Sequence, residues 1–210
     1  MTTPHSPSGD FDVTAGDPPV PLATWRTPRD PAAPPHHVPE ALAARLCAAY
    51  SHPGDPIIDM IGEPSVAAAA AAYGRHHLPA TVHDLIHLLP VEQPIAALVL
   101  LRWPPIPPVP DRVTVEHVIA GVRWLLRPGG CLAVLADLTA GPVNLGTIVG
   151  AAARHGLRYL QHVVAIDADI VGDRLTTDSV PVPPARHARV HRDVLVFTRP
   201  RPDDVDRGAP

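Results

Sequence analysis

The chain has 210 residues, of which 46% are apolar and 4% aromatic, and its formal net charge is −4. That length suits one domain with flexible ends, and the apolar content supplies a core of mainly Ala, Val and Leu. A net negative charge gives no global field for nucleic acid, which argues against a strong autonomous DNA binder. No apolar run reaches membrane-spanning length, and the start lacks the pattern of a signal peptide. We therefore expect a soluble, cytoplasmic protein with no membrane partner.

The first part of the chain predicts a tail followed by one helix–strand–helix unit. Residues 1–35 are rich in Pro, Thr, Asp and Gly, which is typical of a disordered or extended tail. Residues 39–50 predict an amphipathic helix, residues 57–59 a short buried strand, and the alanine-rich stretch 64–73 a second helix. A strand that leads through a tight turn into a helix N-terminus is how doubly wound α/β folds build a nucleotide-type pocket.

The rest of the chain alternates apolar strands with amphipathic helices, which is typical of a mostly parallel sheet covered by helices. The expected strands are 95–101, 131–135, 157–166 and 190–198, and the expected helices are 113–126 and 144–155. We expect the last two strands to pair as an antiparallel hairpin across a polar loop over 167–187. The sequence thus predicts one α/β domain over residues 36–200, followed by a disordered tail over 201–210.

Four partial motifs lie at the ends of these elements. They are His37-x-Pro39 with Pro53-Gly54-Asp55, the turn Asp59-x-x-Gly62, Pro104-Pro105 after a strand, and Leu126-x-Pro128-Gly129-Gly130 before a strand. Together they resemble the motifs of S-adenosylmethionine (SAM)-dependent DNA amino-methyltransferases of the N4-cytosine/N6-adenine class, near its Trm-eleven-like branch. The resemblance covers roughly residues 24–200. It implies a Rossmann-like class I methyltransferase fold, mostly parallel, with helices on both faces and an antiparallel C-terminal hairpin.

The chain is short where the family has its second strand, second helix and third strand. Residues 81–85 resemble the end of the third strand, so we expect the fold to be shortened around the second strand. A tryptophan segment precedes the first helix in the family, and Trp25 matches it. Trp25 then packs near the pocket or simply covers an apolar surface patch.

The resemblance implies SAM as the cofactor. It assigns cofactor binding to Asp59, Ile61, Gly62, Glu63 and Asp84. In the family turn, Asp-Pro-x-x-Gly-x-Gly-Thr, a second glycine stands where this chain has Pro64, which lacks an N–H group. Glu63 puts a carboxylate at a helix N-terminus, where the cofactor's own carboxylate would bind. Either the turn binds nothing, or Glu63 binds the ammonium group of the cofactor in a weak site.

The resemblance also implies a catalytic motif, which in the family is Asp/Asn/Ser-Pro-Pro-Tyr/Phe. It falls on Trp103, Pro104, Pro105 and Ile106. The family's first side chain accepts a hydrogen bond from the target amine, and its last ring stacks on a flipped base. Trp103 only donates, Ile106 has no aromatic face, and Arg102 would repel a sulfonium. The segment is either a Pro-rich turn without chemistry or a site using backbone carbonyls and a displaced Trp103.

Three hypotheses about function follow. The first is a DNA-methyltransferase-like protein with eroded cofactor and catalytic motifs, inactive or weakly active, that binds DNA weakly, a protein partner or a second copy. The second is an active SAM-dependent N-methyltransferase acting on DNA or another substrate. The third is an interaction scaffold without catalysis.

Other polar residues predict less. His83 and His87 have the spacing of two metal ligands on a helix, but no third ligand has a place and the cysteines show no metal-type spacing, so we predict no metal site. The pairs His36-His37 and His76-His77 are expected to be solvated, and Asp137 to cap a loop. A local basic patch comprises Arg186, Arg189, His191 and Arg192, which either contacts phosphates or is solvated.

Overall fold

The computed structural model describes residues 21–28, 33–34, 37–87, 94–136, 143–171, 174–176 and 191–205. Within them the strands are β1 (Leu22–Arg26), β2 (Pro56–Met60), β3 (His76–Pro79), β4 (Ala96–Trp103), β5 (Leu126–Ala136), β6 (Arg158–Ile166), β7 (Asp169–Val171), β8 (Arg174–Thr176) and β9 (His191–Thr198). The helices are α1 (Glu40–Tyr50), α2 (Pro64–Ala72), α3 (Val82–His87), α4 (Val115–Leu125), α5 (Leu145–Arg154) and α6 (Pro202–Val205).

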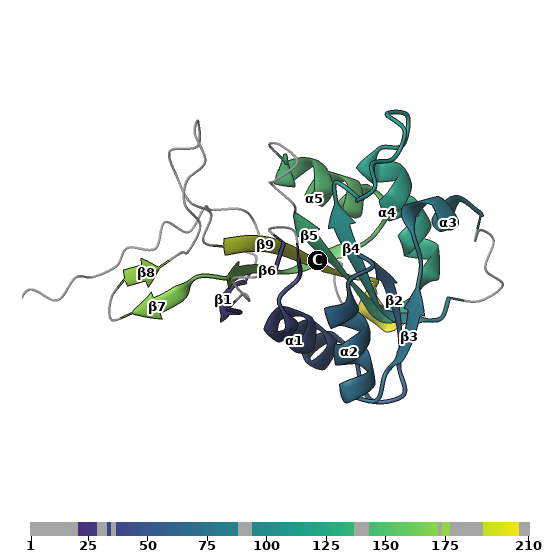
Figure 1. The fold of residues 1–210 in the computed structure, drawn as a ribbon. Coiled ribbons are helices and arrows are strands. Elements are labelled where there is room, and N and C mark those ends of the chain that lie inside the picture. Colours follow the sequence, from purple (N-terminus) through teal and green to yellow (C-terminus); the bar gives the residue numbers. More distant parts are fainter. Residues whose placement is uncertain are drawn as a thin grey trace, which may run out of the picture.

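Seven of the described strands form one sheet in the order β1-β6-β9-β5-β4-β2-β3, and β7 and β8 form a separate hairpin (Figure 1). Neighbours in the sheet are parallel except at β9, which runs antiparallel to both β5 and β6. From β2 the chain moves outward to β3, then returns past β2 to β4 and continues to β5. This is the predicted Rossmann-like class I methyltransferase fold, with its antiparallel C-terminal hairpin.

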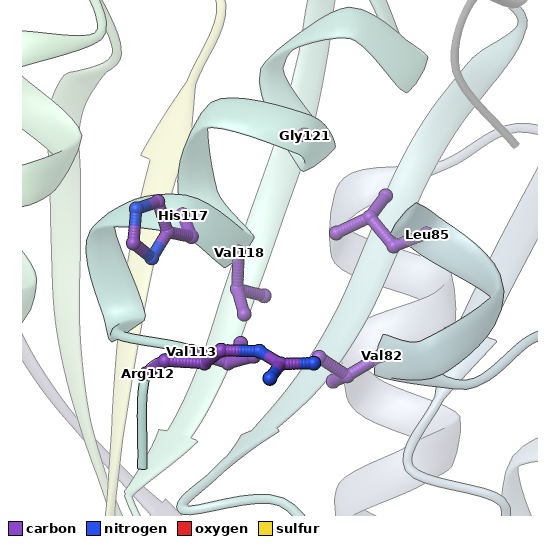
Figure 2. Close-up of a pocket in the computed structure, with 7 residues that line it drawn as sticks. All are labelled: Val82, Leu85, Arg112, Val113, His117, Val118 and Gly121. Atoms are coloured by element: carbon purple, nitrogen blue, oxygen red, sulfur yellow. The ribbon is translucent and has the colours of Figure 1, made fainter. Parts of the chain in front are cut away.

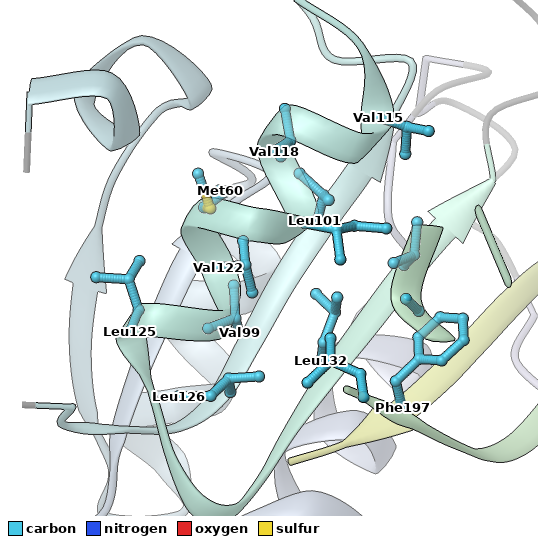
Figure 3. Close-up of a cluster of buried hydrophobic side chains, with 14 of the residues drawn as sticks. Met60, Val99, Leu101, Val115, Val118, Val122, Leu125, Leu126, Leu132 and Phe197 are labelled. Carbon is cyan, nitrogen blue, oxygen red and sulfur yellow. The ribbon is translucent and has the colours of Figure 1, made fainter. Parts of the chain in front are cut away.

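Helices cover both faces of the sheet. In Figure 1, α1 and α2 lie on one side and α3, α4 and α5 on the other. Since neighbouring strand residues point to opposite faces, β4 contributes to two cores: Leu98 and Leu100 pack with α1 and α2, whereas Val99 and Leu101 pack with α4. Figure 3 shows the second of these cores, in which the apolar stripe of α4 meets β4, β5 and Phe197 of β9. The sheet is therefore buried on both faces, as its continuous apolar strands predict.

Local chemistry fixes the ends of α4 and the start of β5. Thr114 begins α4 in a capping box with His117: its side chain accepts the His117 N–H, and the His117 ring accepts the Thr114 N–H. Residues 127–130, which were expected to precede the strand, lie inside β5 at an irregularity in its pairing with β4. Gly130 is required there because a Cβ would lie 2.7 Å from the Ala96 carbonyl oxygen.

Two expectations for the first half of the chain are wrong. Residues 22–26 are not part of a disordered tail, because β1 pairs with β6 and the Trp25 ring stacks on Tyr50 at 6.3 Å. Residues 81–85 are not a strand end but belong to the start of α3. A short second strand, β3, is present beside β2. Between β3 and β4 the described residues contain only α3, so the described part of the fold is shortened around the second strand, as expected.

The described residues contain no helix that is both long enough and apolar enough to cross a membrane. The predicted polar loop over 167–187 contains the β7–β8 hairpin, and residues 177–187 lie outside the described part of the chain.

Candidate functional site

The candidate site lies where the carboxyl ends of β2 and β4 meet. These strands are parallel neighbours, with Asp59 opposite Leu100 and Met60 opposite Leu101. The chain leaves β2 toward β3 and leaves β4 toward β5, so this is the topological switch point at which open α/β sheets bind ligands. Gly62 and Pro104 follow the two strand ends, as the sequence predicted.

Asp59 organises the turn after β2. Its carboxylate accepts the N–H of Ile61 at 2.9 Å and the N–H of Gly62 at 3.1 Å, and Gly62 has a positive φ of 74°. The second carboxylate oxygen lies 3.0 Å from Nε2 of His77 on β3. With a side chain only 2% exposed, Asp59 is fully engaged within the protein. Two backbone N–H groups of the turn predicted to hold the cofactor are therefore already hydrogen-bonded to Asp59.

Glu63 carries the second charge of the site. One of its oxygens accepts a hydrogen bond from Arg102 of β4 at 2.8 Å, and the other lies 2.8 Å from Nδ1 of His37. Arg102 is only 5% exposed and Glu63 11%. Glu63 precedes α2 but its side chain does not cap the helix. The sequence suggested that the positive charge of Arg102 would repel a sulfonium. In the structure, Glu63 neutralises that charge.

The electrostatics of Glu63 follow from these contacts. Burial by itself raises the pKa of a carboxyl group, because it disfavours the charged form. Hydrogen bonds from Arg102 and His37, and the charges of both, outweigh burial and hold the pKa of Glu63 below its usual range. Glu63 is therefore ionised near neutral pH, with both oxygens occupied.

A small cavity lies beside this turn. It has a volume of about 160 Å³ and is lined by the turn after β2, the residues after β3 and the proline segment after β4. Its lining residues are Met60, Ile61, Gly62, Ala80, Thr81, Val82, His83, Pro105, Ile106 and Pro107. Pockets for drug-sized ligands usually measure about 300–1,000 Å³. Pro79 ends β3 and Ala80 follows it, so no carboxylate follows this strand to hold ribose hydroxyls.

The predicted catalytic residues Trp103, Pro104, Pro105 and Ile106 all line one hollow of about 430 Å³ after β4. Pro105 and Ile106 line the small cavity, and Ile106 is 48% exposed. Trp103 packs against the core of α4, and with Pro104 it also lines a hollow beside Asn144 and Thr147 at the α5 start. Trp103 is therefore absent from the lining of the small cavity, but it shares the neighbouring hollow with the rest of the predicted motif.

Asp84 has a local structural role. Its carboxylate accepts hydrogen bonds from the Thr81 N–H at 2.7 Å and the Thr81 hydroxyl at 2.8 Å, at the start of α3. Thr81 and His83 line the small cavity but Asp84 does not. The geometry thus favours a helix cap over the predicted contact with a cofactor.

Two histidines expected to be solvated belong to the site instead. His37 and His77 are 24% and 23% exposed and contact Glu63 and Asp59, whereas His76 is exposed. His37 belongs to one of the four partial motifs, but no local signal marked the acidic partners, which lie 26 and 18 positions away in the sequence. The sequence hinted at a role in the site only through their positions, with His77 near a strand end and His37 before α1.

The remaining candidates are placed as follows. Arg192 is buried and its Nε donates to Asp167 at 3.1 Å, so it does not form the predicted solvated patch. His36, Asp137, Arg186 and Arg189 lie outside the described residues, as does the side chain of His87. Within the described part of the chain, no three His, Cys, Asp or Glu side chains lie close enough together to hold a metal ion.

These observations decide how well the site fits SAM. The methionine end of such a cofactor needs free hydrogen-bond donors and an open anion site, but the Ile61 and Gly62 amides are bound by Asp59 and the α2 start faces Glu63 paired with Arg102. The ribose end has no acid after β3, and the cavity is small. The residues present do not fit the cofactor.

No protein-family model matches the chain, and no curated protein matches it. Similar solved structures include a geranyl diphosphate methyltransferase in complex with GPP and sinefungin, at 14% identity over 77% of this chain and 78% of that chain, with a TM-score of 0.49. TrmN from Thermus thermophilus has 17% identity over 77% of this chain and 49% of that chain, with a TM-score of 0.43. The N-methyltransferase NodS from Bradyrhizobium japonicum, in complex with S-adenosyl-L-homocysteine, has 12% identity over 77% and 86%, with a TM-score of 0.46. Our assignment of the fold is based on strand order and direction.

Proposed function

We propose that this chain is a methyltransferase-like protein, derived from the DNA amino-methyltransferase class, that neither binds SAM tightly nor transfers methyl groups. It keeps the sheet as a scaffold for binding a partner in the cytoplasm. The observation that carries the proposal is the Glu63–Arg102 ion pair, 2.8 Å long and closed by His37 on the other oxygen. Under this proposal, the pair occupies the place at the α2 start that the family resemblance assigns to the cofactor's carboxylate.

Electrostatics support this proposal. A cofactor carboxylate placed at the start of α2 would meet the ionised Glu63, and like charges at close range disfavour each other by several kcal/mol in a low-dielectric site. A cofactor ammonium would have to displace Arg102 or His37 from Glu63. Displacing Arg102 would break its 2.8 Å ion pair with Glu63 at a buried position, which costs more than the new contact returns.

The test is calorimetric titration of the full chain with SAM and, separately, with S-adenosylhomocysteine. We expect no binding heat at millimolar ligand. The matched variant is Glu63→Gly, which frees Arg102 to pair with the carboxylate of either ligand, so weak binding should appear. Micromolar binding by the unchanged protein would refute the proposal. If neither protein binds either ligand, the proposed inactivity still holds, but Glu63 is not the residue that prevents binding.

A second candidate is an active N-methyltransferase on DNA. The specific observation in its favour is that Pro104-Pro105 directly follows β4, and that Pro105 and Ile106 lie across the small cavity from Gly62. Transfer of labelled methyl groups to duplex DNA measures this directly. Transfer above the background without enzyme would replace the first proposal with this one, and we expect none.

A further inference from the structure

A larger apolar pocket lies away from the turn, between α3 and α4 (Figure 2). Its volume is about 350 Å³, which is within the usual range for small-molecule pockets. The lining residues are Val82, Leu85, Arg112, Val113, His117, Val118 and Gly121. Only Val82 also lines the small cavity beside Gly62. The two spaces therefore have different walls and different chemistry.

The pocket lies between two helices of unequal length. With six residues against eleven, α3 is about 9 Å long and α4 about 16 Å. The helices touch at Gly121, where a Cβ would lie 2.8 Å from two carbon atoms of the Leu85 side chain. One turn toward the start of α4, Val118 faces the same side and lines the pocket together with Val82 of α3. The apolar space opens there.

Among the described residues that line this apolar space, Arg112 is the one that carries a permanent positive charge. Arg112 precedes α4, is exposed, and its side chain reaches across the pocket below Val118 toward Val82 (Figure 2). Among the residues that the structure describes, it has no acidic partner, unlike Arg102, Arg127, Arg154 and Arg192. The ring of His117 is already held by its cap with Thr114. Arg112 is thus the group in the wall that is available for a new charged partner.

We propose that this pocket binds a small monocarboxylic acid with a compact aliphatic body. The body packs against Val82, Leu85 and Val118, and the carboxylate pairs with the Arg112 guanidinium. A planar guanidinium matches a carboxylate through two parallel hydrogen bonds. One cation suits a single negative charge, whereas phosphate dianions usually need several donors. This inference does not depend on the function proposed for the switch-point site.

The test uses octanoate as the acid and octan-1-ol as a neutral probe with the same body. Each is titrated into the full chain labelled at the methyl groups of Val and Leu, and binding is followed by NMR. We expect both probes to shift the methyl signals of Val82, Leu85 and Val118, with octanoate binding about tenfold tighter because it adds a charge-assisted contact.

Two variants test whether the carboxylate binds to the charge of Arg112. Arg112→Gln removes the guanidinium at an exposed position, so the fold is retained and octanoate should bind about tenfold more weakly while octan-1-ol is unaffected. Arg45→Gln removes an exposed arginine on α1, on the opposite face of the sheet, and should change neither affinity.

Three results would overturn the proposal. One is the absence of any octanoate-dependent shift at Val82, Leu85 and Val118 at millimolar concentration. Another is equal weakening by Arg112→Gln and Arg45→Gln, which would mean that octanoate senses only the overall charge of the protein. The third is tighter binding of octan-1-ol than of octanoate, which would show that Arg112 does not select a carboxylate.

Discussion

Arg102 carries a full charge on a side chain that is only 5% exposed, at the end of a central strand. A charge taken out of water needs a partner, and removing that partner from a buried pair typically costs about 3–5 kcal/mol. We therefore expect Glu63→Gln to lower the free energy of unfolding by about 3 kcal/mol. Urea denaturation of the two proteins measures this loss directly.

The control for Glu63→Gln is to remove both charges. Replacing a buried pair by uncharged groups of similar size is often nearly neutral, so Glu63→Gln combined with Arg102→Met should recover most of the loss. The difference between the double variant and the sum of the single variants gives the coupling energy. A double variant as unstable as the sum would contradict the pairing.

The same carboxylate makes stability depend on pH. Its folded pKa is lowered by Arg102 and His37 against the opposing effect of burial, so the unfolded chain takes up the proton more readily. The contribution of Glu63 is then fully present above the ordinary glutamate pKa of about 4.3 and is lost as the pH falls further. The stability difference between wild type and Glu63→Gln should shrink steadily below that pH in urea titrations. A constant difference down to the acid limit would contradict this assignment.

At this scale the sequence predicted the positions of the charges but not their partners. Asp59, Glu63 and Arg102 were recognised because they lie at or just after strand ends, which is a local property. Their pairing was not, since Arg102 lies 39 positions from Glu63 and His37 lies 26 positions away. Such contacts are set by how the strands are ordered in the sheet. The sequence alone therefore suggested repulsion of the cofactor by a free charge, where the structure shows an internal ion pair.

The contact between α3 and α4 depends on a glycine. Alanine at Gly121 would gain up to about 1 kcal/mol of helix propensity, but its Cβ would lie 2.8 Å from the middle of the Leu85 side chain. Overpacking of this kind costs about 1–3 kcal/mol. We expect Gly121→Ala to be destabilising by about 1 kcal/mol net, with the melting temperature lower by about 2–4 °C.

The matched control is Gly150→Ala in α5. There the new Cβ would lie 3.3 Å from Nη1 of Arg154, the end of a flexible and exposed side chain. This variant should therefore gain stability from helix propensity, by about 0.5–1 kcal/mol. If both substitutions stabilise the protein, the close approach of Leu85 to Gly121 is not a real constraint.

Elements with a strong periodic pattern were predicted well, and short ones were not. The apolar run of β4 and the amphipathic stripe of α4 lie within a few residues of their predicted bounds. The strand β3 was missed because His76 and His77 read as polar, and its four residues bury little. The helix α3, six residues long, was taken for a strand end since so short an apolar run has no clear period.

The sheet ends at β1 on one side, and this edge was invisible in the sequence. Residues 22–26 sit in a proline-rich stretch that resembles a tail, but they pair with β6 along their whole length. Trp25 and Ala23 pack against the core beneath α1, and the Thr27 N–H donates to the Ile166 carbonyl at 2.8 Å. The strand that β1 pairs with lies roughly 140 residues later in the chain. A segment that is ordered by so distant a partner has no local sequence signal for a strand.

Removal of this edge tests the architecture of the whole molecule. Deleting residues 1–27 takes away the Trp25–Tyr50 stack and uncovers the backbone of β6. We expect the free energy of unfolding to fall by about 2–3 kcal/mol and the melting temperature by about 5–10 °C. The exposed edge should also promote self-association, which sedimentation velocity measures. Deleting only residues 1–20 leaves β1 in place and should change neither quantity. If the longer deletion is as stable and as monomeric as the shorter one, β1 is not an integral strand of the sheet.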